Sequence, residues 1–389
     1  MDRKALLEFK EDLNDPTGWL SSWVGENCCK WRGVGCIKRT GHVIKLDLRN
    51  PLFNNEERNY NRASYERPYL SGKINPSLLH LKHLNYLDLS MINFGRISIP
   101  DFMGSLENLK YLNLSNAYFA GKIPPHLGNL SRLQYLDIHG PVYCCDFTGI
   151  YAENLKWLSG LSSLKYLDMG GVNLTQVGAD WVQAFNMLPP SLSDLHLYGC
   201  GLGSLPLSFS FVNFTSLSVL DLSQNNFNSS MPLWLFNISS LSNLHLRECS
   251  LQGPIPDAFA DMISLQEIDL SFNDLEGEIP GTLGSLCKLG RLDIYFNKMV
   301  GEITKFVDGL SGCTNSGLEM LNFSSNQLSG HLPESLGRPK KLRSLRLDWN
   351  SFWGSIPESI GSLSFLKELD LSNNQKCRTT LRVGGVRSL

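Results

Sequence analysis

Aliphatic residues recur along this chain at one fixed spacing. The frame L-x-x-L-x-L-x-x-N-x-L begins thirteen times, and the commonest interval between successive starts is 24 residues. The starts are Val43, Leu84, Leu109, Leu133, Leu164, Leu192, Leu217, Leu241, Leu265, Leu289, Leu318, Leu342 and Leu366. Self-similarity at such a period marks a chain of stacked units, each of which covers the apolar face of the next. The pattern therefore predicts a repeat solenoid.

Within one repeat, the order of polar and apolar positions predicts a short strand. In LQEIDLSFNDLEGEIP, the side chains of Leu265, Ile268 and Leu270 are expected to point inward. The alternation around Ile268 has the period of a strand with one buried face. The residues expected to face solvent are Gln266, Glu267, Asp269, Ser271 and Phe272. Stacked about 4.8 Å apart, such strands would form one parallel sheet on the concave side, with short helical turns on the convex side.

The ninth position of the repeat predicts an internal hydrogen-bond ladder. An amide both donates and accepts, so Asn273 is expected to satisfy backbone groups of neighbouring turns. In successive later repeats the position holds Cys200, Asn225, Cys249, Asn273, Asn297, Asn326, Asn350 and Asn374. Earlier repeats hold Ile92, Ala117, Pro141 and Val172, which predicts a less regular ladder there. The two cysteines of the ladder are expected to be buried thiols that pack as small hydrophobic residues.

Composition and charge exclude several classes of function. With 389 residues, 42% of them hydrophobic, the chain can build a large core. Its formal charge of −2 provides no basic field for nucleic acid. No apolar run is long enough to span a bilayer, and the charged N-terminus does not match a signal peptide. The sequence has no hydrolase, zinc-protease or nucleotide-binding motif. We therefore expect no enzyme activity, no cofactor and no metal site.

Carboxylates do recur, but they follow the repeat. They hold position five of the strands at Asp88, Asp137, Asp168, Asp221, Asp269, Asp293 and Asp370. This periodicity indicates a structural feature of the repeat rather than an acid–base pair. His80 and His83 lie three residues apart in a return segment, and we interpret them as structural as well.

Four longer stretches carry a resemblance to a known family. They are RKALLEFKEDLNDPTGWLSSW, CCKWRGVGC, LSGKINPSLLHLKHLNYLDLS and GSLCKLGRLDIYFNKMVGEIT, together with the element Gly-x-Ile-Pro at Gly121, Gly253, Gly277 and Gly354. With them the chain resembles plant leucine-rich repeat receptor-like proteins, in particular the type of the fungal ethylene-inducing xylanase receptor. The resemblance implies an α/β repeat solenoid, a horseshoe or superhelix with a parallel concave sheet and a cysteine-containing N-terminal cap.

The resemblance also implies a domain organisation. Residues 1–42 would form the cap, 43–375 about 13 repeats with insertions near 49–69 and 141–160, and 376–389 an aberrant tail. Because the pattern stops after Gln375, we interpret the chain as a truncated ectodomain, with a short secreted form as the alternative. The full-length family lies on the extracellular side of the plasma membrane.

Two disulfides are expected. In the family, the second Cys of the vicinal pair bonds to the third, here Cys29 to Cys36, while the partner of Cys28 would precede this chain. Cys287 and Cys313 occupy similar places in consecutive repeats, and the resemblance supports their pairing. The cysteines left unassigned are Cys144, Cys145 and Cys377. Disulfides require an oxidising compartment.

Seven Asn-x-Ser/Thr sequons agree with an extracellular chain and predict N-glycosylation. They lie at Asn113, Asn129, Asn173, Asn213, Asn228, Asn237 and Asn322.

Functions of different classes stay open at this stage. The first is ligand recognition by the ectodomain of a cell-surface receptor in defence signalling, which would bind a microbial protein or peptide on its concave face. Lacking a kinase, such a receptor would signal through a co-receptor or adaptor kinase. The second is a secreted inhibitor of a microbial cell-wall-degrading enzyme, similar to the polygalacturonase-inhibiting proteins. A third is a non-functional truncated gene product.

The candidate binding residues depart from the default residues of the strand. Positions seven and eight are by default Ser and a variable residue, as in Ser223 and Gln224, and position five is by default Asp. The departures are Arg247, Glu248, Phe272, Tyr295, Phe296, Arg346, Asp348 and Trp349. Exposed aromatic and Arg side chains anchor interfaces. Alternatively, aromatic residues at position eight pack along the sheet edge. A competing column, interpreted mainly as packing, is Tyr86, Tyr111, Tyr135 and Tyr166.

Overall fold

The computed structural model describes residues 1–50, 70–140, 149–206, 212–313, 316–375 and the backbone of 377–378. It forms two compact units, Met1–Cys200 and Gly201–Leu389. Most of the insertion near 49–69 lies outside the described residues. So do the first half of the 141–160 insertion, Cys144, Cys145, the side chain of Cys377 and nearly all of the expected tail.

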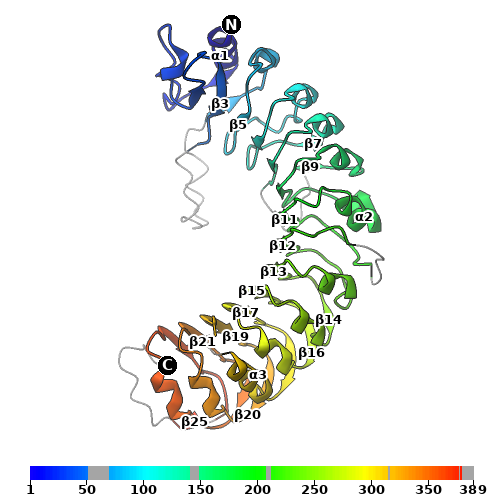
Figure 1. Ribbon diagram of the computed structural model, residues 1–389, viewed down its shortest axis with the longest axis vertical. Coiled ribbons are helices and arrows are strands. Elements are labelled where there is room, and N and C mark those ends of the chain that lie inside the picture. Colours follow the sequence, from blue (N-terminus) through cyan, green and yellow to red (C-terminus); the bar gives the residue numbers. More distant parts are fainter. Residues whose placement is uncertain (51–69, 141–148, 207–211, 314–315, 376, 379–389) are drawn as a thin grey trace. The chain divides into compact units, whose positions relative to one another are not determined.

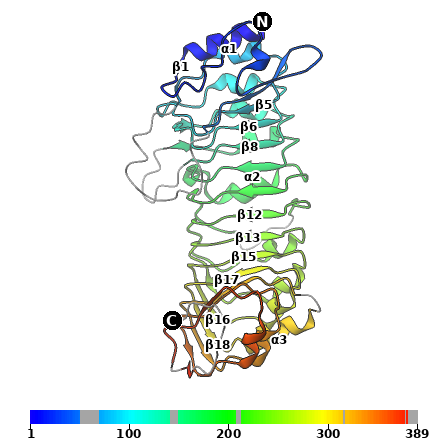
Figure 2. The same ribbon diagram turned by 90° about the vertical axis from the view of Figure 1, so that its left-hand side faces the viewer.

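In the first unit, seven strands follow one another in chain order in a single sheet (Figures 1 and 2). They are β2 (Val34–Cys36), β3 (Val43–Asp47), β5 (Tyr86–Asp88), β6 (Tyr111–Asn113), β8 (Tyr135–Asp137), β10 (Tyr166–Asp168) and β11 (Asp194–His196). Strand β2 pairs with β3 antiparallel, and the later neighbours pair in parallel. Each parallel strand is one repeat of the sequence frame.

The second unit repeats this arrangement with seven parallel strands. They are β12 (Val219–Asp221), β13 (Asn243–His245), β15 (Glu267–Asp269), β17 (Arg291–Asp293), β19 (Met320–Asn322), β21 (Ser344–Arg346) and β24 (Glu368–Asp370). A further sheet of five short strands follows the ladder position, with β14 (Gln252–Gly253), β16 (Asp274–Glu278), β18 (Lys298–Gly301), β20 (Gln327–Gly330) and β22 (Ser351–Phe352). The expected fold class, a parallel repeat solenoid, is confirmed.

The return segments form short helical turns, which lie on the side of each unit opposite the strands (Figure 1). In the first unit these are η3 (Pro76–His80), η4 (Asp101–Ser105), η5 (Pro125–Asn129), η6 (Lys156–Gly160), η7 (Thr175–Asp180) and α2 (Trp181–Asn186). In the second they are η8 (Leu233–Asn237), η9 (Asp257–Asp261), η10 (Gly281–Ser285), α3 (Thr304–Gly309), η11 (Leu310–Gly312), η12 (Glu334–Gly337) and η13 (Glu358–Ser362). Three two-residue pairings complete the strands: β1 (Leu13–Asn14) with β4 (Ser71–Gly72), β7 (Gly121–Lys122) with β9 (Ile150–Tyr151), and β23 (Gly354–Ser355) with β25 (Cys377–Arg378).

The core follows the sequence frame closely. Leu265, Ile268 and Leu270 have no exposed surface, as the alternation predicted. The expectation that Ser271 faces solvent is wrong, because its side chain is also fully buried. Its hydroxyl and backbone N–H both donate to Asp269 Oδ1, at 2.6 and 3.0 Å, so the carboxylate folds over the strand end.

The ladder predicted at position nine is confirmed. Asn273 Oδ1 accepts the backbone N–H groups of Cys249 and Leu251, both at 3.0 Å, and its Nδ2 donates to the carbonyls of Leu246 and Leu270. Asn297, Asn326, Asn350 and Asn374 make equivalent bonds. Buried backbone groups are costly when unpaired, so each Asn stabilises the junction of two turns.

Cysteine at position nine serves the ladder differently. Cys200 and Cys249 are fully buried, as expected. Each thiol also donates to a carbonyl of the preceding repeat at 3.1 Å, that of Met169 or Leu222, and so replaces one bond of the Asn amide. In the repeat before Cys249, the backbone N–H of Phe227 donates to the Cys249 carbonyl at 3.0 Å.

The N-terminal segment closes one end of the first unit. Helix α1 (Asp2–Glu11) buries Ala5, Leu6 and Phe9. Trp23 stacks on Trp31 with ring centroids 5.5 Å apart. The disulfide between Cys29 and Cys36 is formed, and Cys28 is a buried thiol with no disulfide partner among the described residues.

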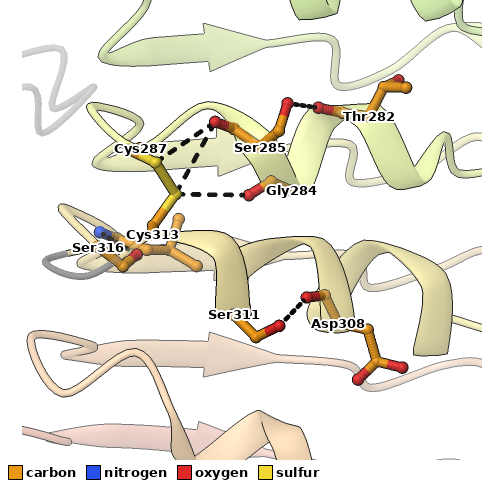
Figure 3. Close-up of a disulfide and its surroundings, with 9 residues drawn as sticks. Thr282, Gly284, Ser285, Cys287, Asp308, Ser311, Cys313 and Ser316 are labelled. Carbon is orange, nitrogen blue, oxygen red and sulfur yellow. Dashed lines mark hydrogen bonds between the residues drawn. A yellow bond between two sulfur atoms is a disulfide. The ribbon is translucent and has the colours of Figure 1, made fainter.

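The second expected disulfide, Cys287–Cys313, is also formed (Figure 3). Cys287 follows η10 and Cys313 follows η11, with a Cα–Cα distance of 5.2 Å. Between them the chain runs through β17, β18 and α3, so the bond joins the return segments of two neighbouring repeats. In the described part of the chain, no helix is long and apolar enough to cross a membrane.

Candidate functional site

The strand face of the second unit presents the largest exposed side chains of the frame. Positions seven and eight are the second and third residues after each strand. Their side chains either cover the strand end or face solvent. Phe296 and Trp349 are 55% and 62% exposed, whereas Asp348 is 7% exposed. Glu248 is exposed, while Arg247, Phe272, Tyr295 and Arg346 are half-buried.

Phe272, Tyr295 and Phe296, called here the aromatic cluster, contact one another across two neighbouring strands. The Phe272 ring centroid lies 4.9 Å from that of Tyr295 and 5.2 Å from that of Phe296. The guanidinium of Arg247 lies 4.1 Å from the Phe272 ring centroid and donates to Ser271 Oγ at 2.9 Å. The structure therefore brings four of the eight candidate residues together, three of them aromatic rings and the fourth the guanidinium of Arg247.

Three aromatic residues of this strand face have an unfavourable backbone conformation. Phe272, Phe296 and Trp349 have φ angles of 56°, 57° and 54°. The turn after each strand requires this conformation, since the N–H of Phe272 there donates to the Tyr295 carbonyl at 2.8 Å. The left-handed region costs an ordinary side chain about 1–2 kcal/mol, and Asn tolerates it better. Asn373 holds the same place in the last repeat. Local stability therefore does not explain the aromatic side chains.

Three of the remaining candidates, Arg346, Asp348 and Trp349, lie apart from the aromatic cluster. The fourth, Glu248, follows Arg247, and its carboxylate accepts a hydrogen bond from Gln224 Nε2 at 3.2 Å. The Asp348 carboxylate accepts a short hydrogen bond from the Ser324 hydroxyl and is not offered to solvent. Arg346 Nε lies 3.9 Å from Asp348 Oδ1 and 3.6 Å from Glu368 Oε1. Trp349 stands exposed beyond this ion-pair group, two repeats from Phe296.

A histidine that the sequence analysis did not single out borders the aromatic cluster. His245, at position five of β13, has Nδ1 3.9 Å from Asp221 Oδ2 and Nε2 3.6 Å from Glu267 Oε1. Asp221 first, and then Glu267, raise the pKa of His245 to about 10 against the effect of burial. Arg291 adds a second cation, with Nε 3.4 Å from Glu267 Oε1. The sequence did contain a signal for this residue, because His245 holds position five, where Asp is the default.

The tyrosine column of the first unit is a packing feature. Successive rings of Tyr86, Tyr111, Tyr135 and Tyr166 stack with centroids 4.1–4.2 Å apart and nearly parallel planes. Lys45 covers the outer face of Tyr86, with Nζ 4.3 Å from the ring centroid. Because the ring faces are occupied, the column offers mainly ring edges to a ligand. This supports the interpretation as cross-strand packing.

The seven sequons fall into different environments. Asn129, Asn228 and Asn237 are exposed, and Asn129 and Asn237 end the helical turns η5 and η8. Asn173 and Asn213 are half-buried. In contrast, Asn113 and Asn322 hold position five of a strand and are 8% and 5% exposed. Their Oδ1 atoms accept the N–H groups of Ser115 and Ser324.

We expect the folded, secreted chain to carry glycans at Asn129 and Asn237 and none at Asn113 or Asn322. A glycan on Nδ2 of a buried position-five residue would have to displace the neighbouring strand. The measurement is peptide mapping after enzymatic release of glycans in H₂¹⁸O, which labels each formerly glycosylated Asn. Asn322 labelled to completion in correctly folded protein would contradict the assignment.

Comparisons with known proteins agree with this geometry. Residues 1–37 match the leucine rich repeat N-terminal domain. The Leucine Rich Repeat family matches residues 108–130, 216–238, 240–262, 264–286, 317–338 and 341–363. Receptor-like protein EIX1 of Solanum lycopersicum is 40% identical over 244 residues, which are 61% of this chain and 22% of that protein. Receptor-like protein EIX2 of the same species is 39% identical over 241 residues, with the same coverage.

Solved structures show the same fold. The plant peptide hormone receptor RGFR1, in complex with RGF2, has a TM-score of 0.61 at 26% identity, covering 78% of this chain and 50% of the receptor. A TDR receptor has a TM-score of 0.62 at 28% identity, over 78% and 54%. This chain spans 22% of the length of the two tomato relatives and about half of these receptors. The chain is therefore a leucine-rich repeat protein, related to the receptor-like proteins of plants.

Proposed function

We propose that this chain is a ligand-recognition region of a plant cell-surface receptor-like protein, and that the strand face of its second unit binds a protein or peptide. The observation that carries the proposal is a set of aromatic side chains on left-handed backbone, namely the half-buried Phe272 and the exposed Phe296 and Trp349. These side chains cost stability where Asn or Gly would not. A binding role supplies the reason for their presence.

The chemistry of the surface suits a polypeptide ligand. Aromatic residues and Arg dominate interface energetics, and the aromatic cluster with Arg247 provides both on rigid strands. Ion pairs of the same strand face, His245 with Glu267 and, in later repeats, Arg346 with Glu368, add polar groups. RGFR1 and PEPR1, the latter solved as PEPR1-AtPEP1 with a TM-score of 0.52 at 26% identity, support a peptide or protein as the class of ligand.

The biological setting is proposed from the relatives. Similarity to the two tomato receptor-like proteins favours defence signalling, a microbial protein as ligand and the extracellular side of the plasma membrane. In this setting, a co-receptor or adaptor kinase would carry the signal inward. A fungal ethylene-inducing xylanase is the first ligand to test, since the resemblance implies that class.

We expect Phe296→Ala and Trp349→Ala each to weaken binding of this xylanase by about 2 kcal/mol or more, which is roughly 30-fold in Kd. Truncation removes an exposed anchor without opening the core, so the fold should persist. The measurement is surface plasmon resonance with the immobilised full chain, with circular dichroism as a check on folding.

Phe365→Ala is the matched control. Phe365 is 55% exposed, as Phe296 is, but it precedes β24 on the connection from η13 rather than standing on the strand face. It should leave Kd within twofold. If the xylanase binds and both Phe296→Ala and Trp349→Ala retain the affinity, the binding surface lies elsewhere. If the xylanase does not bind, secreted fungal proteins are screened with the same variants.

A further inference from the structure

A second group of side chains lies on the strand face of the first unit, outside the proposed ligand surface. Asp137 ends strand β8 and Asp168 ends strand β10. The parallel register places these two residues directly opposite each other. Their side chains are only 6% and 9% exposed. Two carboxylates side by side with little water are unfavourable unless a positive charge lies between them.

The side chain between them is a metal-ligand type. His139 Nδ1 lies 2.8 Å from Asp137 Oδ1 and 3.4 Å from Asp168 Oδ2. Elsewhere on the strand faces, adjacent acidic pairs are neutralised by long basic side chains. Lys45 Nζ lies 3.2 Å from Asp47 beside Asp88, and Arg291 NH2 lies 3.8 Å from Asp293 beside Asp269. Unlike Lys45 and Arg291, His139 has an imidazole nitrogen, which is a common metal ligand. It can therefore coordinate a metal ion together with both carboxylates.

We propose that Asp137, His139 and Asp168 bind one divalent transition-metal ion through Asp137 Oδ1, Asp168 Oδ2 and His139 Nδ1. The three side chains place ligand atoms within 4.8 Å of one another. Donors about 2.0–2.2 Å from a tetrahedral zinc ion lie about 3.3 to 3.6 Å apart. The 3.4 Å distance from Nδ1 to Asp168 Oδ2 fits this range, while the 2.8 Å distance to Asp137 Oδ1 would lengthen by about half an ångström when the ion binds. One imidazole with two carboxylates favours Zn²⁺ or Mn²⁺ over Ca²⁺ or Mg²⁺.

The surroundings complete such a site. Asn116 Nδ2 lies 2.7 Å from His139 Nε2, and after exchange of its amide O and N it would accept the Nε2–H of a metal-bound imidazole. Next to His139, a Cβ on Gly140 would meet no atom of the described residues within 4 Å. A Cβ on Gly170 would instead collide with the Tyr198 ring, which walls the opposite side. The His139 side chain is 21% exposed, so water has access to this side of the three residues.

The site was not visible in the sequence because its parts are distant. Asp137 and Asp168 lie 31 residues apart, across a repeat of unusual length, and no spacing motif links them. Taken one at a time, Asp137 and Asp168 are simply the default residue at position five of the repeat. The expectation of no metal site rested on that reading, and only the strand register places the two carboxylates beside one imidazole.

Zinc titration of the full, untagged chain tests the proposal. After treatment with EDTA and dialysis, isothermal calorimetry with Zn²⁺ should show one ion bound with micromolar affinity that His139→Ser abolishes. Asp168→Asn should weaken it at least 10-fold. Both variants should fold, because Ser115 and Ser90 hold position seven, and Asn113 and Asn322 hold position five, in other repeats.

His245→Ser is the matched control, since His245 also lies between two carboxylates but in the second unit, with its ring nitrogens 3.9 and 3.6 Å away from them. It should leave the micromolar site unchanged. Zinc uptake by His139→Ser equal to that of the unmodified chain, or no saturable uptake by the unmodified chain, would overturn the proposal. In the second case, the imidazole serves the two carboxylates as a hydrogen-bonded cation alone.

Discussion

Asn273→Ala is expected to lower the free energy of unfolding of the second unit by about 4 kcal/mol. The substitution leaves the N–H groups of Cys249 and Leu251 and the carbonyls of Leu246 and Leu270 without their side-chain partner. Each buried, unsatisfied group costs about 1–3 kcal/mol, and water has little access because Asn273 is only 7% exposed. Partial relaxation of the turn reduces the sum.

Hydrogen exchange is the most direct measurement, because solenoids open locally. The amides of Cys249 and Leu251 should exchange about 100-fold to 1000-fold faster in Asn273→Ala, which corresponds to roughly 3–4 kcal/mol. Urea unfolding should show a matching decrease. The control is Asn226→Ala, one residue beyond the ladder and exposed, which should change stability by less than about 0.5 kcal/mol.

Asn273→Cys separates the contribution of the hydrogen bonds that the ladder residue donates from that of the bonds it accepts. Cys249 and Cys200 show that a thiol in this place donates to one carbonyl, whereas the Asn273 amide donates to two neighbouring turns and accepts two N–H groups. The Cys variant should therefore lie between the unmodified chain and Asn273→Ala. Equal stability of the Ala and Cys variants would mean that the accepted N–H bonds, rather than the donated ones, carry the whole effect.

The fold could be predicted from the sequence because one period carries it. Thirteen repetitions of the frame determine which residues are inward, and Ile268 and Leu270 show no departure from it. The ladder followed from the two-sided chemistry of an amide. The two disulfides were expected chiefly from the family resemblance, and both are formed.

Position seven shows where the pattern was insufficient. Ser271 and Asp348 read as exposed in a strand of period two, yet both are buried. After the strand, the backbone bends so that a position-five carboxylate accepts the N–H of position seven, as Asp269 does from Ser271 and Asp293 from Tyr295. This local cap depends on backbone angles, which hydrophobic periodicity does not encode.

The candidate surface was only partly predictable for a related reason. Departures from the default residues pointed to Phe272, Tyr295 and Phe296, and the repeat spacing was enough to expect them on neighbouring strands. The contact of Arg247 with Phe272 depends on side-chain direction, and the separation of Arg346 from the aromatic cluster depends on the Ser324 and Ser325 repeat between them. Single positions do not reveal such pairings.

Replacing both cysteines of the Cys287–Cys313 disulfide by Ala is expected to destabilise the second unit by about 3.5 kcal/mol. The bond closes a loop with a sequence separation of 26, and the loss of loop-closure entropy in the unfolded chain gives this magnitude. The loop contains α3, whose Phe306 and Val307 are fully buried. Removing both sulfurs avoids a free thiol that could form other disulfides.

The same dependence of loop-closure entropy on loop length predicts a smaller effect for the second disulfide. Cys29–Cys36 has a sequence separation of 7, for which the entropy term is about 2.4 kcal/mol, so Cys29→Ala with Cys36→Ala should cost less in the first unit. The measurement is urea unfolding followed by hydrogen exchange, which assigns each loss to its unit. If instead the Cys287–Cys313 pair costs less than about 1 kcal/mol, residual structure in the unfolded ensemble already restricts this loop. The bond would then serve to protect two adjacent return segments against local opening, and exchange at Phe306 and Val307 would rise without a matching change in global stability.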